Sequence, residues 1–361
     1  ADTAKMGGAN VVVRLGTGHL FNLGQLVAAN ALDVEAGEFT NGPDGRLSGA
    51  GVRLALTGAT NNHGRIEATG DLAVKAPNLA NTGSIIANAA GDIQIAGAVA
   101  NNGLITAQRL ALGIGSDLKN SGQIGAHDDL TTTVGGRVDN TGSLIAKDGD
   151  LSLTVGGLIA SSGDIIAGGR LALAAAAYET PADTARIGGA DVVVRLGTGH
   201  LFNLGQFVAA NALDVEAGEF TNGPAGHLSG ASIRLALTGA ADNKGSVETT
   251  GDLALTTQNL ANSGTIQVNG AAVIEIADGF GNSGGLLTRS LALKAGGDFV
   301  NSGQIGAVDD LTATVGGRVD NTGRLIAKDG DLSLTAGGIV ASSGDIIAKG
   351  RLALTAAAYE T

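Results

Sequence analysis

Two pairs of adjacent carboxylates are the residues of this sequence best suited to acid–base chemistry, Asp128-Asp129 and Asp309-Asp310. Clustered carboxylates can supply the acid and the base of glycan cleavage. Neighbouring residues on a strand, however, point to opposite sides of it. Asp129 also belongs to a set of aspartates that come just before alternating apolar segments, namely Asp71, Asp92, Asp129 and Asp150. Because aspartate bonds nearby backbone groups in turns, we interpret these residues as turn-forming and not catalytic.

Neither a metal centre nor a nucleophile is predicted. Asp129 and Asp150 lie one short repeat apart, but Arg109 and Arg170 occupy the same column and compensate the negative charge. The five histidines show no ligand spacing. The chain contains no cysteine, no Gly-x-Ser-x-Gly elbow and no phosphate-binding loop. We therefore predict no catalytic, cofactor-binding or metal-ligating residue, and no enzyme.

The composition excludes several classes of protein. The 34 acidic and 22 basic side chains give a formal charge of −12, which argues against a nucleic-acid partner. Glycine occupies 60 of 361 positions, yet 43% of the residues are hydrophobic, so the chain can bury a core as disordered chains cannot. No stretch approaches the ~18 apolar residues of a membrane helix. We expect no membrane insertion of this segment.

The sequence consists of two copies of one long unit. His19-Leu20-Phe21-Asn22 returns as His200-Leu201-Phe202-Asn203, and Tyr178-Glu179-Thr180 returns as Tyr359-Glu360-Thr361. Since a shaft lengthens by repetition whereas a catalytic cleft gains nothing, this duplication favours a structural role. We predict that residues 1–180 (copy 1) and 181–361 (copy 2) form one continuous rod.

A shorter period of about 20 residues runs through both copies and defines three apolar columns. An Asn-x-Gly pattern marks it at Asn22, Asn62, Asn81, Asn101, Asn120 and Asn140, and Asn41 and Ser161 continue the series. After it comes an x-Ile/Leu-x-Ala segment such as Ser143–Ala146, then a second alternation such as Leu151/Leu153. The third column lies two residues before each asparagine. Alternation with a period of two indicates strands with one buried face.

Three short strands per rung of about 20 residues predict an all-β fold, a parallel β-helix or β-solenoid. A leucine-rich repeat would need a helical segment in each turn, and a propeller needs roughly forty residues per blade. About 18 rungs spaced ~4.8 Å apart give a rod on the order of 85 Å long. We expect glycines with positive φ at the corners, and asparagines that bond from rung to rung as in cross-β ladders.

Two further features stand out on this pattern. Tyr178–Asp183 replaces one expected Asn-x-Gly corner, and Pro181 cannot donate to a ladder, so we expect a loop there. Outward isoleucines could form an exposed apolar stripe, at positions Ile86, Ile145, Ile166, Ile326 and Ile347.

The twenty-residue pattern resembles a known family. Asn-Thr-Gly-Ser-Leu-Ile-Ala-Lys-Asp-Gly-Asp-Leu-Ser-Leu at residues 140–153, which recurs with variations along the chain, is similar to the haemagglutinin repeats of filamentous haemagglutinins and contact-dependent inhibition toxins. Those are bacterial two-partner secretion exoproteins. The resemblance implies a right-handed β-helical shaft that leaves the cell through an outer-membrane secretion partner and is secreted or displayed at the cell surface.

We therefore predict a non-catalytic shaft segment of an adhesin or toxin-delivery exoprotein, whose partner would be a receptor or glycan on a host or neighbouring cell. The alternative is a carbohydrate-binding or carbohydrate-degrading β-helix protein. Because a solenoid exposes strand edges at its ends, we also expect end-to-end self-association.

Overall fold

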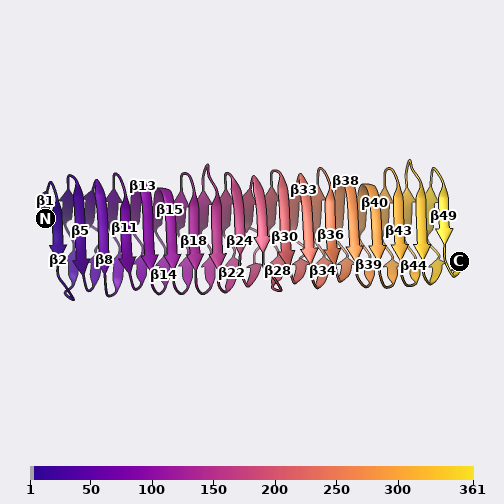
Figure 1. The fold of residues 1–361 in the computed structure, drawn as a ribbon, viewed down its shortest axis with the longest axis horizontal. Coiled ribbons are helices and arrows are strands. Elements are labelled where there is room, and N and C mark those ends of the chain that lie inside the picture. Colours follow the sequence, from indigo (N-terminus) through magenta and orange to yellow (C-terminus); the bar gives the residue numbers. More distant parts are fainter. Residues whose placement is uncertain (1–3) are drawn as a thin grey trace. The chain divides into compact units, whose positions relative to one another are not determined.

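The computed structural model describes residues 4–361, which form strands and turns without any helix. The chain divides into two compact units, unit 1 (Ala1–Ala175) and unit 2 (Ala176–Thr361). Within each unit, strands of successive turns lie side by side and pair in parallel (Figure 1). Equivalent residues of neighbouring turns are 19 to 21 positions apart in the sequence, except after Thr180, where Asn203 follows 23 positions later. The predicted parallel β-solenoid is confirmed.

In unit 1, most turns contain three strands. The first strands are β1 (Lys5–Gly8), β4 (Gln25–Ala28), β7 (Arg46–Gly49), β10 (Arg65–Ala68), β17 (Gln123–Ala126), β20 (Ser143–Ala146) and β23 (Asp164–Ala167). The second strands are β2 (Val11–Arg14), β5 (Ala31–Ala36), β8 (Gly51–Leu56), β11 (Leu72–Ala76), β18 (Leu130–Val134), β21 (Leu151–Val155) and β24 (Arg170–Ala174). The third strands are β3 (Leu20–Asn22), β6 (Phe39–Asn41), β9 (Thr60–Asn62), β12 (Leu79–Asn81), β14 (Val99–Asn101), β16 (Leu118–Asn120), β19 (Val138–Asn140) and β22 (Leu158–Ser161).

Unit 2 repeats this order. The first strands are β26 (Arg186–Gly189), β29 (Gln206–Ala209), β32 (His227–Gly230), β35 (Ser246–Thr249), β42 (Gln304–Ala307), β45 (Arg324–Ala327) and β48 (Asp345–Ala348). The second strands are β27 (Asp191–Arg195), β30 (Ala212–Ala217), β33 (Ser232–Leu237), β36 (Leu253–Thr257), β43 (Leu311–Val315), β46 (Leu332–Ala336) and β49 (Leu352–Thr355). The third strands are β25 (Ala177–Thr180), β28 (His200–Asn203), β31 (Glu219–Asn222), β34 (Ala240–Asn243), β37 (Asn259–Asn262), β39 (Phe280–Asn282), β41 (Phe299–Asn301), β44 (Val319–Asn321), β47 (Ile339–Ser342) and β50 (Ala358–Glu360).

Two turns of each unit differ from the predicted three strands. The first and second strands merge there into one long strand that bends around the corner, as β13 (Ser84–Ile95) and β15 (Leu104–Ile114) in unit 1 and β38 (Thr265–Ile276) and β40 (Gly285–Ala295) in unit 2. The register shifts between Ala87 and Ala90 in β13, where one extra residue forms a bulge. A bulge bends a strand, which allows it to turn this corner without a break.

The core consists of the three apolar columns read from the sequence. Every second residue of a strand is buried, as Leu151, Leu153 and Val155 are in β21. The last residue of the first strand is a buried alanine in turn after turn, for example Ala68, Ala87, Ala107, Ala126, Ala146 and Ala167. The same position also accepts somewhat larger side chains, since unit 2 buries Thr249, Val268 and Thr288 there. This burial fixes the register, since a slip of one residue would turn the apolar set toward water.

The asparagine column forms the predicted ladder inside this core. In unit 1 each Nδ2 donates to the Oδ1 of the next turn, for example from Asn62 to Asn81 at 2.7 Å and from Asn120 to Asn140 at 2.7 Å. Ser161 ends the series, because its Oγ accepts from Asn140 and donates back to the carbonyl of Gly163. Unit 2 has the same ladder through Asn203, Asn222, Asn243, Asn262, Asn282, Asn301, Asn321 and Ser342.

The prediction of a loop at Tyr178–Asp183 is wrong for Tyr178–Thr180. Ala177–Thr180 is strand β25, and Thr180 takes the ladder position, where its hydroxyl donates to Asn203 Oδ1 at 2.9 Å. Tyr178 is fully buried and packs edge-on against Phe207. The turn begins only at Pro181, because a hydroxyl can replace the amide without interrupting the ladder.

The corner glycines are required by close packing and not, as expected, by positive φ. Of residues 4–361, only Gly16 and Gly197 have positive φ. Each lies in a tight turn, which is closed by a hydrogen bond from the backbone N–H of Gly18 to the carbonyl of Leu15, or of Gly199 to that of Leu196. Elsewhere the preceding turn is too close for a side chain. A Cβ on Gly122 would lie 2.1 Å from the carbonyl oxygen of Gly103, well inside van der Waals contact.

Two other expectations need correction. Asp92 does not share the column of Asp71, because Leu72 pairs with Gly91 and places Asp92 opposite Ala73. Ile86 does not belong to the isoleucine stripe, because Glu67 and Thr106 flank it in the neighbouring turns. Ile145 does lie beside Ile166, and Ile326 beside Ile347.

The ladder predicts that its middle members contribute most to stability. Asn140→Leu leaves the Nδ2 of Asn120 and the Oγ of Ser161 without their partner, and an unsatisfied buried polar group costs about 1 to 3 kcal/mol. Asn22→Leu should cost less, because Asn22 bonds one ladder neighbour, Asn41. Hydrogen exchange over β16 and β19 measures the effect, with the exposed Thr141→Leu as control. Equal and negligible effects of both asparagine variants would contradict the ladder's role.

Replacement of the buried polar residue Thr132 should have the opposite effect and stabilise the protein. Its hydroxyl is buried without a hydrogen-bond partner among the described residues, between Leu112 and Leu153 of the adjacent turns. The corresponding residue of unit 2 is Ala313. Thr132→Val should stabilise β18 by about 1 kcal/mol, since it removes the buried hydroxyl and keeps the shape. Thr133→Val, on the exposed face, is the control in the same exchange measurement, and a destabilised Thr132→Val protein would show that the hydroxyl is satisfied.

Candidate functional site

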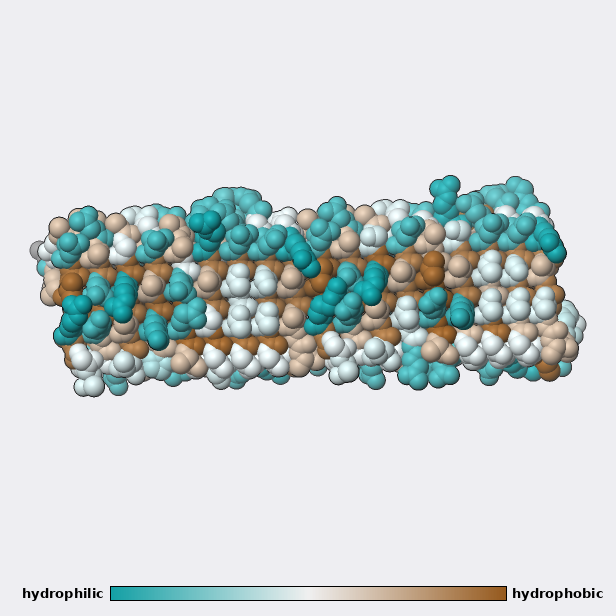
Figure 2. All heavy atoms as spheres, in the orientation of Figure 1, coloured by the Kyte–Doolittle hydropathy of each residue, from teal (hydrophilic) through white to brown (hydrophobic). Residues whose placement is uncertain are grey.

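The densest polar cluster of unit 1 lies on the outer face of its second strands. Arg14 on β2 and Arg53 on β8 flank Asp33 and Glu35 on β5. Arg53 contacts Asp33 at 2.7 Å and Glu35 at 3.3 Å, while Arg14 contacts them at 3.2 Å and 3.3 Å. Figure 2 shows hydrophilic side chains gathered over these strands. The two positive and two negative charges compensate each other within three turns.

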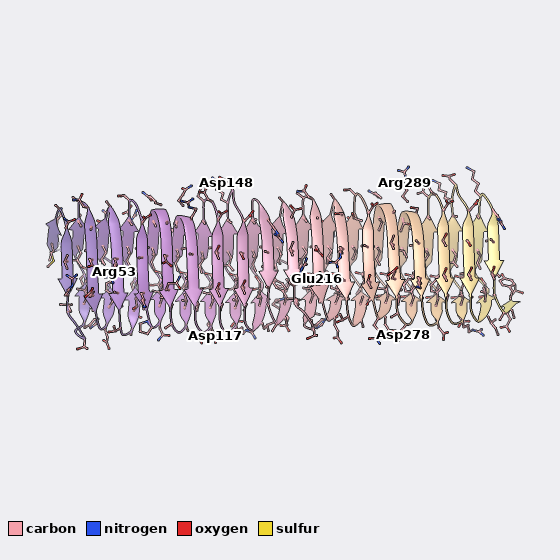
Figure 3. The ribbon with its side chains drawn as sticks, in the orientation of Figure 1. Arg53, Asp117, Asp148, Glu216, Asp278 and Arg289 are labelled. Carbon is pink, nitrogen blue, oxygen red and sulfur yellow. The ribbon has the colours of Figure 1, made fainter. Side chains whose placement is uncertain are left out.

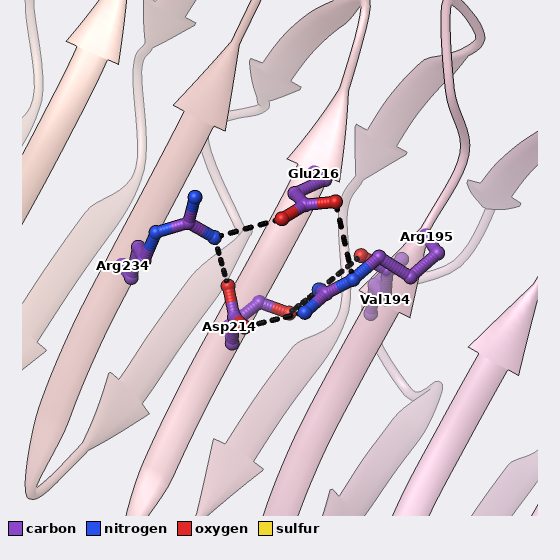
Figure 4. Close-up of polar contacts among 5 residues, drawn as sticks. All are labelled: Val194, Arg195, Asp214, Glu216 and Arg234. Atoms are coloured by element: carbon purple, nitrogen blue, oxygen red, sulfur yellow. Dashed lines mark hydrogen bonds and ion pairs between the residues drawn. The ribbon is translucent and has the colours of Figure 1, made fainter.

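Unit 2 holds the same cluster at the equivalent residues. Asp214 and Glu216 on β30 lie between Arg195 on β27 and Arg234 on β33 (Figure 4). Arg234 contacts Asp214 at 2.7 Å and Glu216 at 3.0 Å, and Arg195 contacts Glu216 at 3.2 Å. All four side chains bind one another, so the cluster presents no uncompensated charge to a ligand.

The same contacts shift the pKa values of these charged groups. Burial of Asp214 favours its neutral form, but hydrogen bonds from Arg195 and Arg234 outweigh this effect and hold the pKa of Asp214 below its usual value. The hydrogen bonds to Asp214 and Glu216 raise the pKa of Arg234. In unit 1 the hydrogen bond that Arg53 donates to Asp33, followed by the one it donates to Glu35, raises the pKa of Arg53. The shifts stabilise charged pairs, whereas a general acid would need the reverse shift.

The adjacent carboxylates of the sequence lie at the corner between the first and second strands and have separate partners. Asp128 Oδ1 accepts from Gln108 Nε2 at 3.0 Å, whereas Asp129 Oδ1 accepts from the backbone N–H of Asp150 at 3.0 Å. The hydrogen bond from Gln108, followed by that from His127, lowers the pKa of Asp128. Asp129 thus bonds a backbone group, as predicted, but that group lies in the next turn, 21 residues along the chain, and not in its own turn. Asp150 Oδ1 likewise accepts a hydrogen bond from the backbone N–H of Arg170.

The corresponding corner of unit 2 carries different charges. Arg289 pairs with Asp309 at 3.3 Å, and Lys349 pairs with Asp329 at 2.8 Å. Asp310 Oδ1 accepts from the backbone N–H of Asp331, as Asp129 does one copy earlier. In Figure 3, Asp148 of unit 1 and Arg289 of unit 2 lie at this corner of their units, and Asp117 and Asp278 lie at the opposite corner. The four aspartates of the two pairs are thus corner residues with local partners.

The histidines bond the hydroxyls of the next turn in four of five cases. The ring nitrogens lie 2.6 to 3.1 Å from a hydroxyl in the pairs His19–Thr40, His63–Thr82, His200–Thr221 and His227–Ser246. His127 lies between Asp128 at 3.2 Å and Asp148 at 3.4 Å, and its equivalent in unit 2 is Val308. Over residues 4–361, no group of three or more His, Cys, Asp or Glu side chains is arranged to hold a metal ion.

Sequence reasoning missed the arginine–carboxylate clusters. The signal was present, because Arg14, Glu35 and Arg53 alternate in sign at intervals of about one turn. Recognising it requires the register of three consecutive turns, which becomes certain only once the strands are paired.

In the described part of the chain, no helix is long and apolar enough to span a membrane.

The charge cluster predicts a defined pH dependence. Because the pKa of Asp214 is lower in the folded protein than in the unfolded chain (about 3.9), its contribution to stability is present above the unfolded value. This contribution is lost as the pH falls through the folded value. Asp214→Asn should therefore destabilise β27, β30 and β33 by about 1 kcal/mol near pH 7. The difference from wild type should shrink as the pH falls through the lowered pKa of the folded protein. Hydrogen exchange against pH measures this, with the exposed Asp278→Asn as control, and a difference that persists in acid would contradict it.

Comparison with known families agrees with the repeat seen in the structure. The family described as haemagglutinin repeat matches residues 27–97, 92–142, 140–177, 187–323 and 304–358. Neither the curated proteins nor the solved structures give a match. The family matches therefore cover most of both units, including the pattern at residues 140–153 that carries the resemblance. The chain belongs to the haemagglutinin-repeat family.

Proposed function

We propose that this chain is a structural segment of the shaft of a secreted or surface-displayed bacterial adhesin or toxin-delivery exoprotein. The observation that carries the proposal is the repetition of one inward pattern in turn after turn of each unit, with the asparagine ladder at its centre. Repetition of such a pattern lengthens a protein without forming a binding or catalytic site. The family supports an adhesin-like shaft.

The distribution of polar groups supports a non-catalytic role. Asp128 is bound by Gln108, Asp129 by a backbone N–H, and the arginines by carboxylates of adjacent turns. A catalytic carboxylate needs a pKa near the working pH and access to substrate. The resolved carboxyl pKa shifts here are downward, away from neutral pH.

We propose further that the two copies lengthen one shaft, which leaves the cell through an outer-membrane secretion partner. The binding or toxic function would then belong to other parts of a longer protein, with a receptor or glycan on a host or neighbouring cell as its target. The duplication supports this division of roles, because a spacer gains length from each added copy.

Carbohydrate binding is the second candidate, and one surface feature favours it. An open hollow on unit 2 presents amide, hydroxyl and guanidinium groups beside apolar ones, and is lined by Gln267, Asn269, Leu287, Thr288, Arg289 and Val308. The amide and guanidinium groups can bond sugar hydroxyls, whereas the Thr288 hydroxyl is buried and donates to the carbonyl of Gly306. The hollow contains none of the aromatic side chains on which sugar rings stack. Glycan-array binding by the 361-residue chain, lost on Gln267→Ala and Asn269→Ala, would favour this candidate over an inert shaft.

The shaft proposal predicts that the paired aspartates do no chemistry. Conversion of Asp128, Asp129, Asp309 and Asp310 together to Asn should preserve the fold, because an asparagine Oδ1 can still accept the same backbone N–H. Polysaccharide-cleavage assays should show no activity that distinguishes this variant from wild type, with Asp278→Asn as control. Cleavage by wild type that the fourfold variant alone loses would overturn the structural role.

A further inference from the structure

Four Asn-Gly dipeptides occur in the chain, a sequence in which asparagine can lose its side-chain amide without an enzyme. They are Asn41-Gly42, Asn102-Gly103, Asn222-Gly223 and Asn269-Gly270. In this reaction the backbone nitrogen of the glycine attacks Cγ of the asparagine. Glycine favours the attack because it has no Cβ to obstruct the approach. The four dipeptides share this chemistry, so differences between them in the folded protein reflect their surroundings.

Two of the four asparagines belong to the ladder and are held at both ends of the amide. Asn41 and Asn222 are 0% exposed. Asn41 Nδ2 donates to Asn62 Oδ1 at 2.8 Å, and its Oδ1 accepts from Asn22 Nδ2 at 2.8 Å. Asn222 has the same two ladder bonds. Loss of either amide would break both bonds at a site closed to water, so we expect these two residues to be stable.

Asn102 lies outside the ladder, at the exposed corner between β14 and β15. The Ser121 hydroxyl of the next turn donates to Asn102 Oδ1 at 2.7 Å. When a nucleophile attacks Cγ, negative charge develops on this oxygen, and a hydroxyl already directed at it stabilises that charge. The corner therefore holds an exposed electrophile together with a donor for the developing charge.

The backbone nitrogen of Gly103, the nucleophile of this corner, is weakly held. Its N–H donates to the carbonyl oxygen of Asn81 at 3.2 Å, and the same oxygen accepts the N–H of Asn102 at 2.8 Å. The N–H groups of Gly42 and Gly223, by contrast, each donate to a carbonyl at 2.8 Å. Since a longer hydrogen bond to a shared acceptor is weaker, less energy is required to free the Gly103 nitrogen.

We propose that Asn102 is a site of spontaneous deamidation. The Gly103 nitrogen gives its proton to water and bonds to Cγ of Asn102. The Cγ–Nδ2 bond breaks, and Nδ2 takes up a proton and leaves as ammonia. Water then opens the resulting succinimide at one of its two carbonyls, which yields aspartate or isoaspartate. Water is the only co-reactant, nothing is oxidised or reduced, and the reaction is independent of the role of the chain as a shaft.

The two products differ in their effect on the corner. Aspartate adds a carboxylate to the outer surface of unit 1 and leaves the backbone unchanged. Isoaspartate inserts the Cβ of residue 102 into the backbone. The corner is tightly packed, since a Cβ on Gly103 would lie 2.1 Å from the carbonyl oxygen of Gly83. The longer backbone should therefore disturb β14 and β15, whereas the aspartate product should keep their hydrogen bonds.

Peptide mapping by mass spectrometry, after incubation of the folded 361-residue chain near neutral pH, tests the proposal. Asn102 should convert roughly tenfold or more faster than Asn41 and Asn222. Asn269 should react at an intermediate rate, because it is exposed but the N–H of Gly270 holds a hydrogen bond of 2.9 Å. In concentrated urea the four rates should converge. Conversion of Asn102 in the folded chain no faster than that of Asn41 would overturn the proposal.

Variants at two positions test the roles of the amide and the hydroxyl. Asn102→Ser introduces the residue of unit 2 at this position, Ser283, and should abolish the charge change while preserving the fold. Ser121→Ala should slow the conversion roughly two- to tenfold, because one hydrogen bond to the developing charge is lost. Ser121→Thr should keep the wild-type rate, since Thr141 occupies this position in the next turn. Equal rates in Ser121→Ala and wild type would contradict the assistance by the hydroxyl.

Discussion

The hydrogen bond between asparagine side chains of successive turns is the interaction on which the rest of this structure depends. A buried amide must find both a donor and an acceptor, and here the Oδ1 accepts from the asparagine of one adjacent turn while the Nδ2 donates to that of the other. Each turn must therefore bring its asparagine back to the same place after 19 to 21 residues. The glycine that follows is constrained as well, since the carbonyl of the preceding turn leaves no room for a Cβ at Gly122.

The outer surface of each turn is free of this constraint, and its residues vary accordingly. The Arg14–Asp33–Glu35–Arg53 cluster is retained in unit 2, whereas Arg46 and Arg65, which bind Glu67 in unit 1, are replaced by His227 and Ser246. In both cases the polar side chains bond to side chains of their own or a neighbouring turn. They do not surround a shared cavity. A surface whose charges are compensated locally fits a protein that supports other parts of a larger assembly.

Much of the fold could be predicted because its determinants are local and repeated. The period, the three buried columns and the ladder follow from residue spacing alone. Where one member of a column is replaced, the pattern fails. Gly91 takes a leucine position, so the predicted alignment of Asp92 with Asp71 is two residues out of register. Thr180 could not be recognised as a ladder residue beside Pro181, because only the paired structure shows that its hydroxyl reaches Asn203. The charge clusters, likewise, require the register of three turns.

The most direct test of this account is the hydrogen exchange of the asparagine side-chain amides, measured by NMR on the 361-residue chain. Ladder members such as Asn81, Asn120 and Asn301 should exchange their Nδ2 protons as slowly as the backbone amides of the adjoining strands. The exposed Asn102 should exchange at the rate of a free amide. Rapid exchange of the ladder amides, equal to that of Asn102, would show that the asparagines face water and would contradict the ladder as the organising interaction.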